Sequence, residues 1–507
     1  MEPESLTAAE ESPSKSPAFS APVAQPKRLA VNFAYLTAGE MTAKLLTFAS
    51  FSYLARHLGP ANYGILEFTL AVMTFFTLPA DLGLSWYGAR EVARNPERGP
   101  RLLHEITGLR FALSLCSMAG LVIFILVINK SFEQKALLGI YCISLLATPF
   151  LLQWFFQAYD RMAWVGGASI VRQIGFAGLV FLFCRGKSSL LWVGLAECVS
   201  VTCLASYCVF LTRYRLGAPW PWPDLHLGRL MGHIRESLPI GLSELSWAFM
   251  WYFCTVLLGL FSTDINLGWF GASHRTVMAM HTFVMLYFFN LLPSIARCVG
   301  RPNSQLLQLM DRSVRFVSWT GLYAAATLSV LSPWVLQLLY GRPFRVGAST
   351  FSILVWMLPI AMLSGHHRYI LVAYNKQTRL LGCMVASAAA AVVCGLVLTP
   401  LYGSRGAACA LIFANALNLA LVYISVSKLI VNVPLWPQLS APLAALSVGA
   451  LIYFSLVGWN RFAALAAGSL WYLGVLAWKD GSSLLTFLQS LVRGAGHRRA
   501  LETSDPA

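Results

Sequence analysis

Several ionisable side chains of this sequence lie in the interior of long apolar segments. The basic ones are Lys44, Arg110, Arg172, Arg275 and Arg368. A charge at the centre of a membrane helix costs roughly 2.5–3.5 kcal/mol on insertion scales, so it is found mainly where it faces a partner or a water-filled cavity. A guanidinium group presents a planar fork of donors that matches phosphate and carboxylate oxygens. These residues therefore indicate an anion-binding site inside the membrane.

The depth of each cation within its segment separates the candidates. At about 1.5 Å per residue, Arg172 lies about 12 Å along its predicted helix and Arg275 about 15 Å along its own, near the middle of the membrane. For these two we predict contact with an anion in a cavity. Arg110 and Arg368 lie closer to helix ends, where a long side chain can instead reach the headgroups. Arg110 and Lys44 complete the predicted substrate-binding set, and the headgroup alternative stays open for Arg110.

Carboxylates inside apolar segments are predicted to couple or gate transport. Glu40, Asp81, Glu197 and Glu244 could pair with the cations, or bind a proton or a sodium ion. Glu40 lies about 16 Å along its helix and Glu244 about 10 Å, so we expect both to face a cavity between two halves of the molecule. Asp81 follows Pro79 near the cytoplasmic side. We predict that it closes an inner gate by pairing with an arginine that bridges the two halves.

Two of the acidic residues have simpler interpretations. Glu40 and Lys44 are four residues apart on one helix face, so they could form a plain internal ion pair. Glu67 lies near the outer end of its segment, where we expect it to be solvated.

The cysteines form no Cys-x-x-Cys pair and no histidine is spaced as a zinc ligand. We therefore predict no catalytic residue, no metal and no cofactor other than a coupling proton or sodium ion.

The elements that must position these side chains are membrane-spanning helices. The 507 residues are 57% hydrophobic and 11% charged, against about 25% charged in soluble domains, and the mean hydropathy is +0.64. Because about 20 apolar residues cross the hydrocarbon core of a bilayer, the composition predicts an all-α polytopic membrane protein with about 14 helices. We place them near residues 29–55, 61–89, 104–128, 136–158, 164–184, 189–212, 237–261, 265–296, 313–339, 348–373, 378–399, 405–428, 437–457 and 462–479.

One connection divides the first twelve helices into two groups of six. It contains Pro219-Trp220-Pro221-Trp222-Pro223 and then a short amphipathic stretch of interfacial character. Glu40 and Glu244 lie in the first helix of each group, as in a parallel repeat. The predicted organisation is a disordered cytoplasmic tail at 1–26, an N-terminal six-helix lobe at 27–212, a cytoplasmic connecting loop at 213–236, a C-terminal six-helix lobe at 237–430, two additional helices at 431–479 and a cytoplasmic tail at 480–507.

Basic residues outside the helices set the predicted orientation. The formal charge is +16, but the cations are distributed among the loops and form no nucleic-acid patch, so we predict no nucleic-acid partner. Sorting the loop Lys and Arg by side gives 22 on the side of both termini and nine on the other. Cations gather on the cytoplasmic side of a membrane, which places both termini in the cytoplasm.

Short motifs of the chain resemble those of one known family. The chain has Tyr53-Leu54-Ala55-Arg56 followed by Leu58-Gly59-Pro60 and Tyr63-Gly64, then Asp81-Leu82-Gly83-Leu84 and Ala89-Arg90-Glu91, and later Ser237-Leu238-Pro239-Ile240, Leu267-Gly268-Trp269-Phe270 and Pro400-Leu401-Tyr402-Gly403. In order and spacing these resemble polysaccharide biosynthesis membrane proteins. These are the Wzx-like lipid-linked oligosaccharide (O-antigen) flippases of the multidrug/oligosaccharidyl-lipid/polysaccharide exporter, or MATE-like, superfamily. Cys254 departs from the pattern, because relatives often carry an Asp there, and this puts an ion-coupling role of that position in doubt.

The resemblance carries expectations for the fold, the activity and the partners. It implies two six-helix lobes around a central cavity, alternating access, and a polyprenyl diphosphate-linked glycan moved to the outer leaflet of the bacterial inner membrane. Membrane lipid, a polysaccharide polymerase and glycosyltransferases are the other partners that it implies. The diphosphate would be the anion held by Arg172 and Arg275.

Two other functions remain open. A drug or metabolite cation antiporter of the same superfamily would favour carboxylates over arginines in its cavity, and the intramembrane cations argue against it. A membrane glycosyltransferase or polymerase usually places acidic catalytic residues in a long outer loop. The predicted outer loops are short and hold few acids, so we expect a protein that is not an enzyme.

Overall fold

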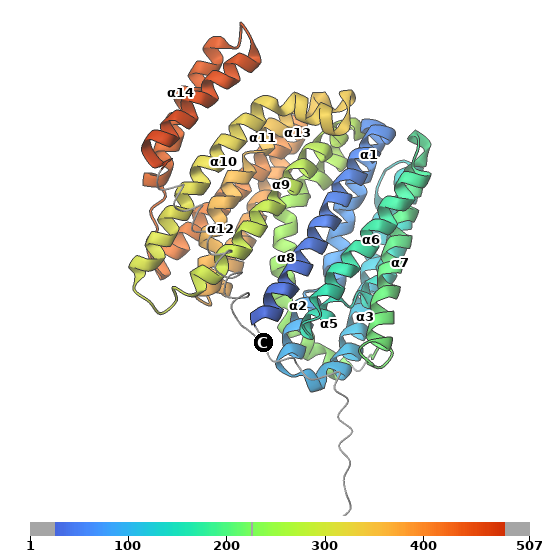
Figure 1. Ribbon diagram of the computed structural model, residues 1–507. Helices are drawn as coiled ribbons and strands as arrows, with labels where there is room; N and C mark the ends of the chain where they lie inside the picture. The colour runs from blue at the N-terminus through green and yellow to red at the C-terminus, as the bar shows by residue number, and fades with distance from the viewer. Residues whose placement is uncertain (1–25, 225–226, 482–507) are drawn as a thin grey trace, which may run out of the picture.

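The computed structural model describes residues 26–224 and 227–481 of the chain, and those residues form helices and no strands (Figure 1). The predicted tails at 1–26 and 480–507 lie almost entirely outside the described residues. The elements are α1 (Pro26–Asp81), α2 (Leu84–Arg94), η2 (Pro96–Arg98), α3 (Gly99–Val127), α4 (Phe132–Ser144), η3 (Leu145–Phe150), α5 (Gln153–Ala158), α6 (Met162–Phe183), η4 (Lys187–Ser189), α7 (Leu190–Tyr214), α8 (Leu227–Phe261), α9 (Asp264–Ala296), α10 (Asn303–Tyr340), η5 (Arg342–Gly347), α11 (Ala348–Leu354), α12 (Met357–Ala373), α13 (Gln377–Leu429) and α14 (Trp436–Leu456). A last helix follows over Arg461–Gly481.

Twelve helical segments of the described residues are long and apolar enough to cross a membrane, which confirms the predicted all-α polytopic class. Two of them are of double length. A straight helix of the 56 residues of α1 would be about 84 Å long, far more than the roughly 30 Å of hydrocarbon. The helical geometry of α1 breaks at Gly59, with φ 74°, and that of α13 breaks at Gly403, with φ 58°. Dividing both helices there gives the fourteen crossings that the sequence predicts.

The helix bounds differ from the predicted ones in two places. The stretch before Ser237 was predicted as a loop with a separate short helix, but α8 begins at Leu227 and continues through it. The second crossing ends at Asp81 and restarts at Leu84, because Leu82 and Gly83 adopt positive φ values. A left-handed residue interrupts a helix more sharply than Pro79, which lies inside the helical stretch.

The helices form two groups with α8 between them. Figure 1 shows α1–α7, coloured blue to green, on one side and α9–α13, yellow to orange, on the other. We call α1–α7 the N-lobe and α8–α13 the C-lobe, because α8 packs against α13. The two halves of α1 carry most of the contact between the lobes, since α1 packs against both α8 and α9.

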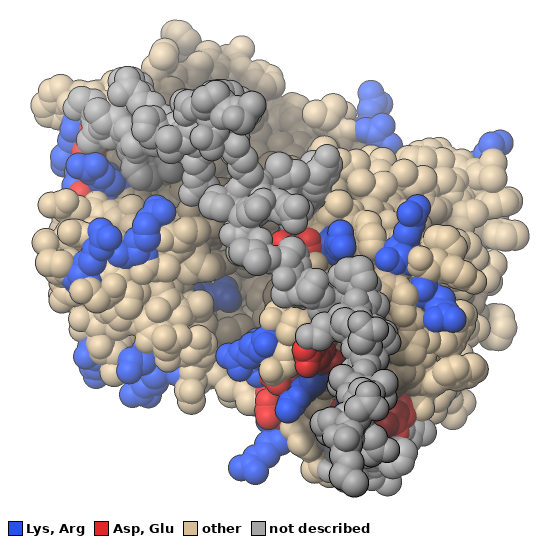
Figure 2. All heavy atoms as spheres, turned by 60° about the horizontal axis from the view of Figure 1, so that its bottom comes forward, with Lys and Arg blue, Asp and Glu red and all other residues tan. Residues whose placement is uncertain are grey.

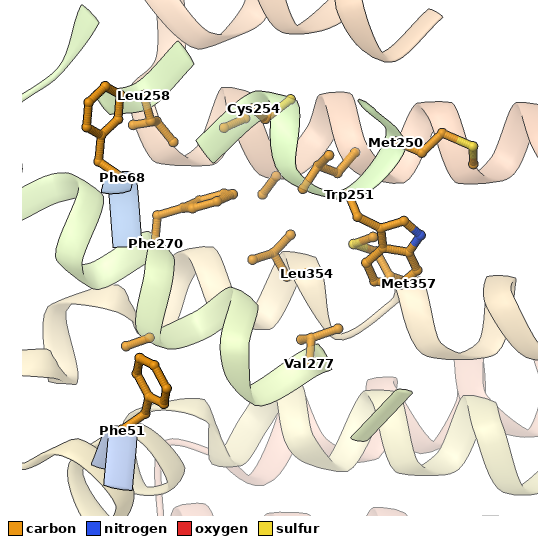
Figure 3. Packing of buried hydrophobic residues seen from close by; sticks show 14 of the residues in the cluster. Phe51, Phe68, Met250, Trp251, Cys254, Leu258, Phe270, Val277, Leu354 and Met357 are labelled. Carbon is orange, nitrogen blue, oxygen red and sulfur yellow. The ribbon is translucent and has the colours of Figure 1, made fainter. Parts of the chain in front are cut away.

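A buried apolar core continues across the lobe interface. In the close view of Figure 3, Phe68 of α1 lies beside Leu258 of α8 with Phe270 of α9 below them, while Trp251 and Cys254 of α8 lie further along the same layer. Cys254 is fully buried in this cluster. The apolar surroundings suit a small hydrophobic side chain there.

The two helices that follow the C-lobe are fastened to α10. Asp480 accepts hydrogen bonds from Arg315 at 2.9 Å and from the indole of Trp319 at 2.8 Å. Tyr472 donates to the backbone carbonyl of Trp319 at 2.9 Å, and Gln438 of α14 donates to Asp311 at 2.8 Å. Trp319 and Tyr472 are both buried. This terminal hairpin, α14 with Arg461–Gly481, is therefore attached to the C-lobe by buried polar contacts as well as by packing (Figure 1).

One face of the molecule is strongly basic. Figure 2 turns the lower end of Figure 1 toward the viewer and shows Lys and Arg side chains distributed over this face. The exposed residues Arg94, Arg215 and Arg301 lie in segments that the charge rule assigns to the cytoplasm.

Accessibility labelling checks this orientation. In a background without native cysteines, Arg94→Cys, Arg215→Cys and Arg301→Cys should all be protected from a membrane-impermeant thiol reagent in intact cells. Arg185→Cys, in an exposed connection predicted to be outside, should react and serves as the positive control. Labelling of any of the first three in intact cells would contradict the orientation.

Candidate functional site: a polar cavity and the contacts that close it

A polar cavity of about 450 Å³ lies in the N-lobe. Four of the predicted site residues line it: Glu40 and Lys44 of α1, Arg172 of α6 and Glu197 of α7. Hydroxyl and amide groups complete the polar wall, namely those of Thr47, Thr74, Thr77, Tyr141, Ser144, Thr148, Gln153, Ser169 and Gln173. Every lining residue belongs to the N-lobe, whereas Glu40 was predicted to face a cavity between the lobes.

Close packing of α1 on α6 places Glu40 at this cavity. Gly39 and Gly166 let the two backbones approach, because a Cβ atom at Gly39 would lie 2.7 Å from the Cα atom of Gly166. Small residues serve this purpose in membrane helices generally. Ser169, one turn further along α6, donates a hydrogen bond to Glu40 at 2.6 Å. Among the ion pairs of the described residues, none joins Glu40 to Lys44.

The cavity contains one ion pair, between Arg172 and Glu197. The Arg172 side chain remains 45% exposed, so part of its guanidinium group faces the cavity. Lys44 is exposed to the same space. With Glu40 and Glu197 ionised, the two cations and two anions balance. An anionic ligand would therefore bind most favourably once one carboxylate is protonated or displaced from its cation.

Arg275 lies outside this cavity and pairs with Glu67 at the lobe interface. The pair is bidentate, with distances of 2.6 Å to Oε1 and 3.0 Å to Oε2. The guanidinium also lies 3.6 Å from the ring centroid of Phe51. Glu67 is buried, so the prediction that it is solvated was wrong. The error has a physical cause, because depth along one helix does not show what a neighbouring helix covers.

Glycines bring α1 and α9 together around this pair. A Cβ atom at Gly64 would lie 1.9 Å from the carbonyl oxygen of Asp264, and one at Gly268 would lie 1.9 Å from that of Pro60. A Cβ atom at Gly271 would lie 2.4 Å from the Cγ atom of Glu67. The small-xxx-small spacing of Gly268 and Ala272 is the sequence signal that could have indicated this close approach.

Two more polar contacts join the lobes on the same side. Arg56, in α1, donates to the backbone carbonyls of Leu338 and Leu339 in α10. Gln134 of α4 donates to Asp264 of α9 at 2.8 Å. Together with the Glu67–Arg275 pair, they hold the lobes together at the end of the molecule that the charge rule places outside.

At the opposite end the lobes meet through α2 and α8. Glu244 accepts a hydrogen bond from the indole of Trp86 at 2.7 Å, so it lies at this contact and not at the N-lobe cavity. Arg90 and Glu236 are 3.8 Å apart on the same two helices. A Cβ atom at Gly83 would lie 2.7 Å from the backbone nitrogen of Gly241. The lobes are therefore in contact at both ends of the molecule.

Asp81 pairs with Arg110 within the N-lobe. The Nε–Oδ1 distance is 3.0 Å, and Arg110 also donates to the Leu151 carbonyl at 3.1 Å. Because Arg110 belongs to α3, the expected pairing of Asp81 with an arginine that bridges the lobes does not occur in this structure. Arg110 is buried and is not part of the cavity wall. The structure thus gathers four of the eight predicted site residues in one cavity and separates Arg110, Asp81, Arg275 and Glu244 from it.

Comparisons with known proteins agree on the type of fold. A family model described as polysaccharide biosynthesis protein matches residues 29–299. The chain is 19% identical over 409 residues to an Escherichia coli (strain K12) protein named "Putative O-antigen transporter", covering 79% of this chain and 97% of that one.

Solved structures of the same fold include the lipid II flippase MurJ in an inward closed conformation, with a TM-score of 0.67, 12% identity and coverage of 88% of this chain and 99% of that one. An inward-facing multidrug MATE family transporter of the MOP superfamily gives a TM-score of 0.59 at 14% identity, covering 78% and 97% of the two chains.

Proposed function

Because the chain belongs to the polysaccharide biosynthesis protein family, we propose that it is a flippase that moves a polyprenyl diphosphate-linked oligosaccharide across the bacterial inner membrane. Both termini lie in the cytoplasm, and no covalent bond is made or broken. The observation that carries the proposal is the polar cavity of about 450 Å³ with Arg172 and Lys44 in its wall. Its volume falls within the roughly 300–1,000 Å³ of small-ligand sites.

The cations of the cavity supply the chemistry that a diphosphate needs. A phosphate group inside the membrane loses its hydration, and fixed N–H donors replace that water. Arg172 offers a fork of donors and Lys44 offers a mobile ammonium group. The sugars, which carry hydroxyl groups, suit the Thr, Ser and Gln side chains of the wall. The polyprenyl chain and the surrounding membrane lipid stay in the hydrocarbon.

Alternating access follows from the contacts at the two ends. Opening to the outside requires separation of α1 from α9 and loss of the buried Glu67–Arg275 pair. Opening to the cytoplasm requires separation of α2 from α8 and loss of the Trp86–Glu244 hydrogen bond. Each set of contacts holds one end closed while the other opens, so the cavity meets one side of the membrane at a time. The glycosyltransferases that build the glycan and the polymerase that consumes it are the expected protein partners.

A transport assay tests the substrate class. Purified protein in vesicles should move a fluorescent polyprenyl diphosphate saccharide to the opposite leaflet, as measured by the fraction that becomes accessible to an impermeant quencher. Vesicles without protein give the background rate. A protein that does not move this lipid, but moves an organic cation against a proton gradient, would contradict the proposal.

The cation antiporter remains the second candidate, because Glu40 and Glu197 line the same cavity as the two basic residues. An organic cation would pair with these carboxylates in the way that a diphosphate pairs with Arg172 and Lys44. The two functions differ in which substitution is harmful. Loss of Arg172 would impair lipid flipping, whereas an antiporter would lose transport with Glu40→Gln and tolerate changes at Lys44.

The carboxylates are proposed to couple transport to a proton or a sodium ion. Replacing Glu40 by Gln keeps its contact with Ser169 possible but removes the charge. We expect Glu40→Gln to flatten the pH dependence of flipping in vesicles, and Glu244→Gln to do so if coupling also involves the lobe contact at Trp86. Asp81→Asn should slow flipping at every pH, because it weakens the buried pair with Arg110. An unchanged pH profile in both Gln variants would reject the coupling role.

A further inference from the structure

A second, much smaller cavity lies in the C-lobe at the position that corresponds to the N-lobe cavity. With α1 and α13 divided at their kinks, the N-lobe cavity is lined by the first, second, fourth, fifth and sixth crossings of its lobe. The C-lobe cavity is lined by the same five crossings of the other lobe. Its volume is about 20 Å³, and its polar lining residues include His281, Ser364, Arg368, Asn415 and Asn418.

Arg368 differs from Arg172 in having no acidic partner. Among the described residues, no ion pair includes Arg368, and its buried Nε atom has no hydrogen-bond partner. The wall of its cavity contains no Asp or Glu. In the N-lobe the sixth crossing supplies Glu197 to the arginine, whereas in the C-lobe the sixth crossing supplies the neutral amides Asn415 and Asn418.

The amides of the sixth crossing are largely engaged elsewhere. Asn418 accepts from Ser364 at 3.1 Å and donates to Ser387 at 3.3 Å. Asn415 donates to the Leu411 carbonyl at 2.9 Å. These groups cannot offset a full positive charge. Arg368 is partly buried and its Nε atom is enclosed, so its charge loses part of its hydration and gains no Coulomb attraction in return.

We propose that the C-lobe cavity binds one monatomic anion of the halide class, held by Arg368. The size of the cavity favours this class. One water molecule needs about 10–15 Å³ of cavity volume, and the C-lobe cavity has a volume of about 20 Å³. A diphosphate does not fit in that space. The ion supplies the negative charge that Glu197 supplies to Arg172 in the other lobe. The site does not depend on which substrate occupies the N-lobe cavity.

Thermal unfolding of the purified full-length protein tests the site. In wild type, exchange of gluconate for chloride or bromide at constant ionic strength should raise Tm in a saturable way. In gluconate, Arg368→Met should be at least as stable as wild type, because it removes a partly buried cation that has no acidic partner in the cavity wall. In chloride, the variant should lack the rise. Arg345→Met removes an exposed cation of η5 and is the matched control, which should keep the wild-type response.

Binding of radioactive chloride, measured by a scintillation proximity assay on the same samples, gives a second readout. Wild type and Arg345→Met should bind one chloride per chain, and Arg368→Met should bind none. Equal chloride binding in Arg368→Met and wild type would overturn the proposal. So would an Arg368→Met variant that is destabilised equally in both anions, since that result would show a partner within the protein. A Tm rise with pyrophosphate but not with halide, kept in Arg172→Ala and lost in Arg368→Met, would assign the C-lobe cavity to a larger anion and also overturn the proposal.

Discussion

Arg275→Met is expected to lower the free energy of unfolding by about 3–5 kcal/mol, because it leaves the Glu67 carboxylate buried without its partner. The two groups form a bidentate pair between α1 and α9, and Gly271 packs directly against the Glu67 side chain. The double variant Glu67→Met/Arg275→Met removes both charges. It should recover most of the stability, because replacement of a whole buried pair by apolar groups is often neutral or stabilising.

Denaturant unfolding in detergent measures this double-mutant cycle. The two single variants should each be much less stable than the double variant, which gives a large coupling energy between the positions. A double variant as unstable as Arg275→Met would show that the charge pair does not determine the effect.

The same double variant separates stability from gating. If the pair holds the outer end closed, a cysteine placed at Thr47 in the N-lobe cavity should react faster with an impermeant reagent added outside the cell. The matched control is Arg315→Met/Asp480→Asn, which removes a partly buried pair between α10 and the terminal hairpin, away from the lobe interface. It should leave the labelling rate from outside unchanged. Equal rates in both backgrounds would contradict a gating role for Glu67 and Arg275.

Arg172→Ala is expected to reduce glycan flipping by about 10- to 100-fold at unchanged protein level. A hydrogen bond to a charged group contributes roughly 1.5–3 kcal/mol, and about 1.4 kcal/mol corresponds to a factor of ten. Arg172→Lys should recover part of the rate, because the charge remains and the planar fork is lost. Full activity of the Ala variant would place the diphosphate away from the N-lobe cavity.

Glu197→Gln distinguishes substrate binding from simple structural support by Arg172. The substitution removes the charge that Arg172 meets in the absence of ligand. If Arg172 binds the diphosphate, the variant should bind the lipid more tightly, because an acidic competitor is gone, and should release it more slowly. Lipid binding measured by fluorescence at equilibrium gives the affinity. A weaker affinity in Glu197→Gln would show that the pair serves only to orient Arg172.

The membrane-crossing helices and the residues of the N-lobe cavity were predictable from the sequence, because both depend on the residues of one short segment at a time. Apolar length alone fixes where helices cross, and rare charges inside them indicate polar surroundings. Glu40, Lys44, Arg172 and Glu197 fulfil this expectation in the N-lobe cavity.

Which charged side chains pair with each other depends on how distant helices pack. A short stretch of sequence does not show that packing. Glu67 and Arg275 are 208 positions apart, and only the close approach of α1 and α9 at Gly64 and Gly268 shows that one covers the other. The same limit applies to Asp81. The sequence shows a carboxylate near the cytoplasmic side, but Arg90, Arg94 and Arg110 are equally available to it in sequence terms. The packing of α1 on α3 decides in favour of Arg110, so the pair forms inside one lobe.

The terminal hairpin offers a way to observe the two lobes separately in spectroscopic experiments. Because Asp480, Arg315 and Trp319 fasten it to α10, a dye attached at Asn460 should follow the C-lobe as a rigid extension. A second dye at Arg185, in the exposed connection between α6 and α7, would follow the N-lobe. Energy transfer between the two dyes would then report the angle between the lobes in single molecules, without any label in the cavity or at either closed end.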